Sequence, residues 1–148
     1  MSLELRRAGA QDLNALVQLE ASTFATDRLS RARFAHHLNS PRADLLVAVN
    51  GIGPVGYGLM LYRRGSTISR LYSLAVAPGS QGQGLATQLV NALRAAARER
   101  KVRQVHLEVA ESNAAARHLY TGLGGRVVHR LPGYYENGED AVRMVLPV

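Results

Sequence analysis

The chain has no cysteine, only one lysine, Lys101, and no long apolar run. Without cysteine it can form no disulfide, no thiolate nucleophile and no thiolate metal site. The longest apolar stretches, such as Leu45–Val49, are far too short to cross a membrane, so no membrane partner is expected. The N-terminus also lacks the basic segment and apolar run of a secretory signal. Together these absences predict a cytoplasmic protein.

The charge is predominantly of one sign. Eighteen Lys and Arg residues against 11 Asp and Glu residues give a formal net charge of +7 and a pI of about 10.5. Such a balance favours anionic partners, for example a phosphorylated cofactor or a nucleic acid. The arginines are scattered rather than arranged in a stripe, which favours a bias of composition over a nucleic-acid face. Nucleic acid is therefore not the expected partner.

Hydrophobic residues make up 47% of the 148 residues and charged residues 20%, which fits one globular domain over 1–148. Periodicity predicts strands over Leu3–Arg7, Leu45–Val49, Val55–Arg63, Thr67–Val76, Gln104–Val109, Arg126–Leu131 and Ala141–Leu146. It predicts helices from Leu13 after an Asp12 cap, over Arg31–Leu38 after Ser30, from Leu85 to about Arg100, and over Asn113–Thr121. This order predicts an α/β fold with a mixed central sheet of about seven strands and about four flanking helices.

A glycine-rich turn joins the Thr67–Val76 strand to the longest predicted helix, with the sequence Gln81-Gly82-Gln83-Gly84-Leu85-Ala86. The first turn of a helix has free backbone N–H groups and the positive end of the helix dipole. Glycine lets a phosphate approach that backbone, and Thr87 adds a hydroxyl group at the same end. A pyrophosphate fits such a site, although the glycines are equally compatible with a tight turn that binds nothing. The spacing of dinucleotide folds and the lysine of Walker loops are both absent.

The turn belongs to a longer ordered set of motifs. Gln81-x-x-Gly84-x-Ala86 matches the pattern Q/R-x-x-G-x-G/A. Further motifs precede and follow it in the sequence: Leu71–Val76 with Ala77-Pro78, Leu107-Glu108-Val109, Ser112-Asn113, Leu119-Tyr120, Gly122 and Gly133-Tyr134-Tyr135. From about Thr67 to the end, the chain resembles the GNAT superfamily of N-acetyltransferases. Within that superfamily it resembles the branch that acetylates the N-terminal alanine of ribosomal proteins.

The resemblance implies acetyl-CoA as co-substrate and no metal. The residues implied to hold the pyrophosphate end are Gln81, Gly82, Gln83, Gly84, Leu85, Ala86 and Thr87. In such enzymes the strand before the turn carries a bulge and splays from the next strand, and the pantetheine arm pairs with it. In this chain that maps to Leu74, Ala75 and Val76, with the N–H of Val76 facing the thioester carbonyl. Asn113 would touch the arm and also cap the following helix.

By resemblance, Glu108 is the general base and Tyr120 the general acid. Glu108 interrupts an apolar strand, where desolvation would raise its pKa toward neutrality. The alternatives are a salt-bridged Glu108 at the end of a sheet and a buried Tyr120 whose hydroxyl bonds the backbone. His106 shares a strand face with Glu108 and either assists proton transfer or simply packs. No third ligand makes a metal site there.

The acceptor is expected to lie between two loops, where Asp27, Tyr134, Tyr135 and Glu136 would contact it. An α-amine has a pKa of about 7.7–8.0 against about 10.4 for lysine, so one modest base deprotonates an N-terminus more easily. The expected reaction is acetyl transfer to the N-terminal α-amine of a protein or peptide. Two alternatives stay open: a small acceptor such as a polyamine, amino acid or antibiotic, and a non-catalytic acyl-CoA-binding module.

Overall fold

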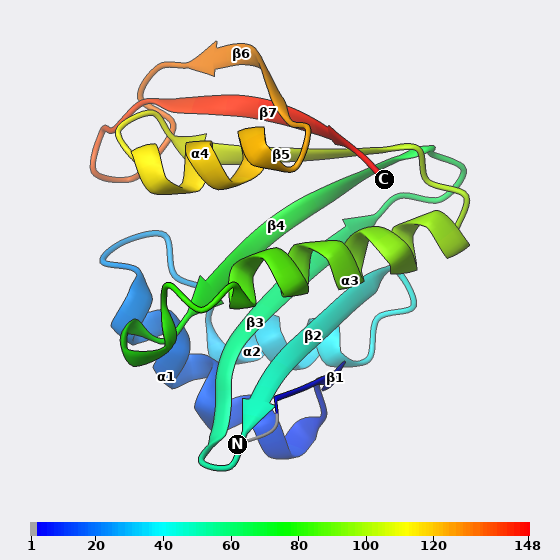
Figure 1. Ribbon diagram of the computed structural model, residues 1–148, viewed down its shortest axis with the longest axis vertical. Coiled ribbons are helices and arrows are strands. Elements are labelled where there is room, and N and C mark those ends of the chain that lie inside the picture. The colour runs from blue at the N-terminus through cyan, green and yellow to red at the C-terminus, as the bar shows by residue number, and fades with distance from the viewer. Residues whose placement is uncertain (1–2) are drawn as a thin grey trace.

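The computed structural model describes residues 3–148 as a mixed seven-stranded sheet with helices on both faces (Figure 1). The strands are β1 (Glu4–Arg7), β2 (Ala43–Asn50), β3 (Gly53–Tyr62), β4 (Ile68–Val76), β5 (Gln104–Ala110), β6 (Arg126–Leu131) and β7 (Ala141–Pro147). The helices are α1 (Leu13–Thr23), α2 (Arg31–Leu38), α3 (Leu85–Glu99) and α4 (Ala114–Gly122), with 3-10 turns η1 (Ala10–Asp12) and η2 (Pro78–Ser80). The predicted α/β architecture of seven strands and four helices is confirmed.

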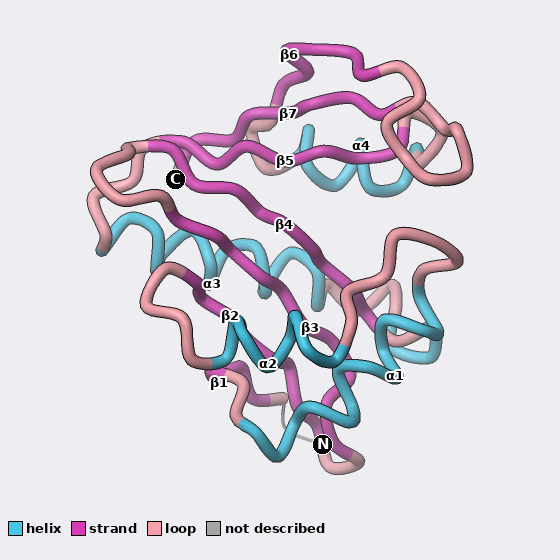
Figure 2. The backbone as a smooth tube through the Cα atoms, turned by 180° about the vertical axis from the view of Figure 1, so that it is seen from behind, coloured by secondary structure: helices cyan, strands magenta, loops and turns pink. Residues whose placement is uncertain are grey.

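The strand order is β1-β2-β3-β4-β5-β7-β6. Every neighbouring pair is antiparallel except β4 and β5, which α3 connects by a crossover. This parallel pairing extends over only three residues of each strand, Ile68–Arg70 against Gln104–His106. Beyond it β4 and β5 diverge, so that the sheet opens between them (Figure 2).

A bulge in β4 marks the point where the two strands separate. Leu59 on β3 pairs with Ser73 and the next residue, Met60, pairs with Leu71, so Tyr72 is an extra residue without a partner. An extra residue bends a strand and increases its local twist, which turns β4 away from β5. The bulge and the splay that the resemblance implied are therefore both present.

The helices bury apolar residues against both faces of the sheet. On one face, α3 turns Leu89 and Leu93 inward, as the predicted periodicity required. Gly58 on β3 permits this packing, because a Cβ atom there would lie 2.7 Å from Cδ1 of Leu93. On the other face, α1 and α2 bury Leu16 and Phe34, and the Phe34 ring meets Tyr57 of β3 edge-on at 5.3 Å.

The prediction that Asp12 caps α1 is wrong. Its side chain makes no cap hydrogen bond to that helix. The carboxylate instead accepts from the Gly9 N–H at 2.8 Å and from Nη1 of Arg6 at 2.7 Å. The 3-10 turn η1 precedes α1, so the last residue in extended conformation before the helical segment is Gly9 rather than Asp12. The Ser30 cap of α2 is confirmed, since its hydroxyl accepts from an N–H three residues on.

Asp44 on β2 ties four elements together. Its carboxylate is fully buried and pairs with Arg7 of β1 at 2.7 Å and with Arg100, beyond α3, at 3.1 Å. It also accepts from the Tyr62 hydroxyl of β3 at 2.6 Å. Burial by itself would raise the pKa of Asp44, but the hydrogen bonds from Tyr62 and Arg7 and the charge of Arg100 lower it.

No helix within residues 3–148 is both long and apolar enough to span a bilayer.

Replacing Asp44 by Asn leaves two arginines without their anion, and we expect a loss of about 2 kcal/mol in the free energy of unfolding at pH 7. Because the native pKa of Asp44 is lowered, its contribution exists above the ordinary value of about 3.9 and disappears as the pH falls below it. Urea unfolding at neutral pH and at about pH 3 measures both effects. Glu99→Gln is the control, since Glu99 is exposed and forms no ion pair within the described chain. A gap between Asp44→Asn and wild type that does not shrink at acid pH would contradict this account.

Candidate active site

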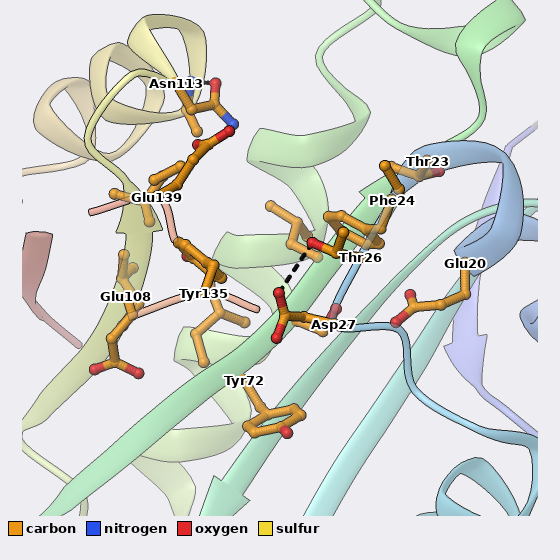
Figure 3. Close-up of a pocket in the computed structure, with 18 of the residues that line it drawn as sticks. Glu20, Thr23, Phe24, Thr26, Asp27, Tyr72, Glu108, Asn113, Tyr135 and Glu139 are labelled. Atoms are coloured by element: carbon orange, nitrogen blue, oxygen red, sulfur yellow. Dashed lines mark hydrogen bonds between the residues drawn. The ribbon is translucent and has the colours of Figure 1, made fainter. Parts of the chain in front are cut away.

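A pocket of about 350 Å³ lies where β4 and β5 separate (Figure 3). Residues 71–74 of β4 and 107–110 of β5 line it, together with α1 and its following loop, the start of α4 and the β6–β7 loop. The two loops that were expected to wall the acceptor site do meet, because the Glu136 N–H donates to Oδ2 of Asp27 at 3.2 Å. Segments far apart in the sequence thus enclose one cavity.

The glycine-rich turn before α3 is exposed and has the predicted shape for an anion site. Gly82 and Gly84 adopt φ values of +78° and +79°, a region that residues with a Cβ atom seldom occupy. No side-chain cap closes the helix at Gly84. The N–H groups of the first helical turn, Leu85–Thr87, consequently have no partner inside the helix. An anion such as a pyrophosphate is the ordinary ligand of this arrangement.

The edge of β4 beyond the bulge offers unpaired backbone groups. The Ala77 N–H donates to the Val55 carbonyl at 2.8 Å, so it points toward β3. Because N–H directions alternate along an antiparallel strand, those of Leu74 and Val76 point the other way, into the opening. The N–H of Ala75 points toward β3, so this predicted cofactor contact is not turned to the opening. The Gln81 side chain donates to the Val76 carbonyl at 3.2 Å and joins the turn to this edge.

Glu108 on β5 lines the pocket with a side chain that is 6% exposed. The sequence left open whether this carboxylate is desolvated or salt-bridged, and the structure places two arginines against it. Nη2 of Arg70 lies 2.5 Å from Oε1, and Nε of Arg143 lies 2.9 Å from Oε2. The salt-bridged alternative therefore describes the resting arrangement. Sequence reasoning missed both arginines, and the one available signal was a lone charge, Arg143, in the apolar strand 141–146.

Tyr120 projects into the pocket from the last turn of α4 and is 7% exposed. Burial and the nearby Tyr135 raise its pKa, so the phenol keeps its proton at neutral pH. Its hydroxyl makes no hydrogen bond to any group of residues 3–148, so the alternative of a backbone-bonded hydroxyl does not hold. A protonated phenol that faces a cavity is suited to donate its proton.

The other predicted residues divide between the pocket and its rim. Asn113 lines the pocket and caps α4, because its Oδ1 accepts from an N–H three residues on at 3.1 Å. Tyr135 lines the pocket, and burial with the neighbouring Tyr134 raises its pKa to about 12. Tyr134 lies at the rim, where its hydroxyl accepts from Nη2 of Arg70 at 2.8 Å. Glu136 meets Asp27 through its backbone rather than its carboxylate.

Burial and the charge of Arg143 lower the pKa of His106 below its ordinary value. It does not belong to a ligand cluster: the described part of the chain has no group of three or more His, Asp or Glu side chains able to hold a metal ion.

A second buried carboxylate lines the pocket and escaped prediction as a site residue. Glu20 on α1 is 2% exposed and lies across the pocket from Glu108 (Figure 3). It accepts hydrogen bonds from the Leu29 N–H at 2.6 Å and from the Tyr57 hydroxyl at 2.5 Å. Burial raises its pKa. The signal in the sequence was an acidic residue on the apolar side of a predicted helix.

Comparison with known proteins assigns a class to this fold and site. The acetyltransferase (GNAT) family matches residues 12–124. The chain is 30% identical over 155 aligned positions to the N-alpha-acetyltransferase of Saccharolobus solfataricus, covering 97% of this chain and 92% of that protein. It is 31% identical over 144 positions to an uncharacterised N-acetyltransferase of Methanocaldococcus jannaschii, covering 95% and 89%. The crystal structure of the ribosomal-protein-S18-alanine N-acetyltransferase from Escherichia coli superposes with a TM-score of 0.88 at 28% identity, over 99% of this chain and 94% of that one.

The chain therefore belongs to the acetyltransferase (GNAT) family. It is an N-acetyltransferase, and like the family in general it depends on acetyl-CoA. The free N–H groups at the start of α3 and the unpaired edge of β4 suit the two polar parts of that co-substrate, its pyrophosphate and its amide-containing arm.

We expect Gly84→Ala to weaken acetyl-CoA binding about fivefold, because a Cβ atom at a φ of +79° costs about 1 kcal/mol and shifts the free turn toward conformations that do not present its N–H groups. Isothermal titration calorimetry measures the dissociation constant. Gly79→Ala is the matched control, because Gly79 has no positive φ and an added Cβ would meet nothing within 4 Å. Equal affinities for the two variants would exclude Gly84 from the binding turn.

Proposed function

We propose that the enzyme acetylates the N-terminal α-amine of a protein or peptide. The observation that carries this proposal is a pocket that is partly open to solvent and lined by Tyr135, whose neighbour Tyr134 is 42% exposed. An extended chain end can enter such a pocket with its amine first. Two relatives support the choice, since one is named an N-alpha-acetyltransferase and the other an alanine N-acetyltransferase of ribosomal protein S18.

Acetyl-CoA would lie along the opening between β4 and β5. The N–H groups of residues 85–87 would bind its pyrophosphate, and the backbone of Leu74 and Val76 would pair with its pantetheine arm. The Val76 N–H faces the opening and is our candidate donor to the thioester oxygen. Asn113, at the start of α4, would contact the arm from the other side.

The reaction follows from the groups around the pocket. The amine nitrogen attacks the acetyl carbon, and the negative charge that develops on the carbonyl oxygen is stabilised by backbone N–H. Glu108 takes a proton from the nitrogen as the new C–N bond forms, and Tyr120 donates its proton to the sulfur as the C–S bond breaks. The two arginines hold the Glu108 carboxylate in place before the reaction.

Glu108→Gln and Tyr120→Phe should each lower kcat at least about a hundredfold, because each removes one proton-transfer group and keeps the shape of the side chain. Release of free CoA with a peptide that begins with alanine measures the rates. Glu111→Gln is the matched control, since Glu111 is also an acidic residue beside β5 but pairs with Arg130 away from the pocket. Wild-type rates in either variant would remove that residue from the mechanism.

A small polycationic acceptor is the second candidate. Four acidic residues line the pocket and would attract a polyamine: Glu20, Asp27, Glu108 and Glu139. We expect an alanine-initiated peptide to be acetylated faster than spermidine, and the same peptide with a blocked α-amine not to react. Mass spectrometry of the products identifies the acetylated nitrogen. Turnover confined to small amines would keep the chemistry and overturn the peptide acceptor.

A further inference from the structure

Three side chains, Ser73, Tyr57 and Glu20, form a continuous series of hydrogen bonds that begins at the pocket and ends at a buried carboxylate. Oγ of Ser73 on β4 lies 2.6 Å from Oη of Tyr57 on β3, and that hydroxyl lies 2.5 Å from Oε1 of Glu20 on α1. Oε2 of Glu20 accepts from the Leu29 N–H. Ser73 adjoins the bulge, and both Ser73 and Glu20 line the pocket, whereas Tyr57 is fully buried between them.

The number of hydrogens that each side chain can donate fixes which group donates and which accepts in these hydrogen bonds. An ionised Glu20 can only accept, so the single hydrogen of the Tyr57 hydroxyl is donated to it. Ser73 must then donate its hydrogen to Tyr57, and its free lone pairs are left to accept from the pocket. The carboxylate polarises both hydroxyls, which strengthens Ser73 as an acceptor. The natural partner for such an acceptor is an N–H of the incoming ammonium group.

Resting on the proposed function, we propose that Ser73, Tyr57 and Glu20 form a relay that deprotonates the acceptor ammonium. A proton passes from the nitrogen to Ser73 while the Ser73 proton moves to Tyr57 and the Tyr57 proton moves to Glu20. The ammonium becomes a neutral amine and the carboxylate becomes a carboxylic acid. After the product leaves, the proton returns along the same chain to water in the pocket.

The nitrogen of an ammonium loses two protons before it is an amide nitrogen, and a separate base can take each of them. An α-amine with a pKa of about 7.7–8.0 arrives mostly protonated at pH 7. Glu108 takes the proton that leaves as the amine attacks, and the relay takes the earlier one. The surroundings of the two carboxylates differ accordingly: two guanidinium groups hold Glu108, whereas Glu20 forms no ion pair within residues 3–148.

The groups that face Glu20 favour proton uptake. Burial raises its pKa, and the hydrogen bonds from Leu29 and Tyr57 and the charge of Arg28, in the loop after α1, only partly oppose this rise. Burial and the charge of Glu20 raise the pKa of Tyr57, so the phenol transmits a proton without ionising. The neighbouring Tyr72 on β4 also raises the pKa of Tyr57.

Tyr57→Phe breaks the relay and preserves the ring. For an alanine-initiated peptide we expect kcat/KM at pH 7 to fall about six- to tenfold, because only about a sixth to a tenth of the amine arrives neutral there, and we expect the deficit to vanish above about pH 8.5. Ser73→Ala should show the same pattern. The Glu108→Gln deficit should persist at high pH, because its proton is released only during attack. Profiles of kcat/KM from about pH 6.5 to 9.5 separate the two cases.

Tyr62→Phe is the matched control, because it also removes a hydroxyl of β3 that donates to a buried carboxylate, at 2.6 Å to Asp44, away from the pocket. Tyr62→Phe should lower the thermal stability about as much as Tyr57→Phe does, and it should leave the pH profile of kcat/KM unchanged. A Tyr57→Phe deficit that is independent of pH, or no deficit at all, would overturn the relay while the acetyltransferase function stands. A wild-type enzyme inactive toward every amine would overturn the proposed function and the relay with it.

Discussion

The chemistry of this protein depends on the early separation of β4 from β5. A continuous sheet would satisfy the backbone of both strands and leave no room between them. The extra residue at Tyr72 bends β4 after three paired positions, so Leu74 and Val76 turn polar backbone groups toward an opening instead of a strand. Buried backbone groups require partners, and an extended ligand with amide groups would supply them. The separation of the strands thus leaves part of β4 without a neighbouring strand.

Three buried carboxylates show how surroundings assign different tasks to one chemical group. Asp44 holds β1, β2, β3 and the end of α3 together, because cations and a phenol satisfy it completely. Glu108 pairs with two arginines but lines a cavity, where the pairs fix the orientation of its carboxylate. Glu20 receives hydrogen bonds from neutral donors only, and burial raises its pKa.

Local signals predicted the parts of the site that depend on neighbours in sequence. The glycine-rich turn, the face of α3 and the cap at Asn113 follow from helix geometry and backbone sterics within a few residues. The Asp12 cap failed because a turn of 3-10 helix intervened, and a salt bridge with Arg6 offered the carboxylate a better partner. The resemblance placed Glu108 and Tyr120 in one site, and the structure brings both to the same pocket.

By itself, the sequence determined the elements, the glycine-rich turn and the family, because periodicity, glycine positions and motif order are properties of consecutive residues. Only the tertiary structure decided the partners of each charge. Arg70 and Arg143 reach Glu108 through strand register, and Ser73, Tyr57 and Glu20 meet across β4, β3 and α1. Such contacts join residues up to 38 positions apart, as in the pair of Arg70 and Glu108. No local pattern encodes them, because the packing of α1 on the sheet and the bulge in β4 set their distances.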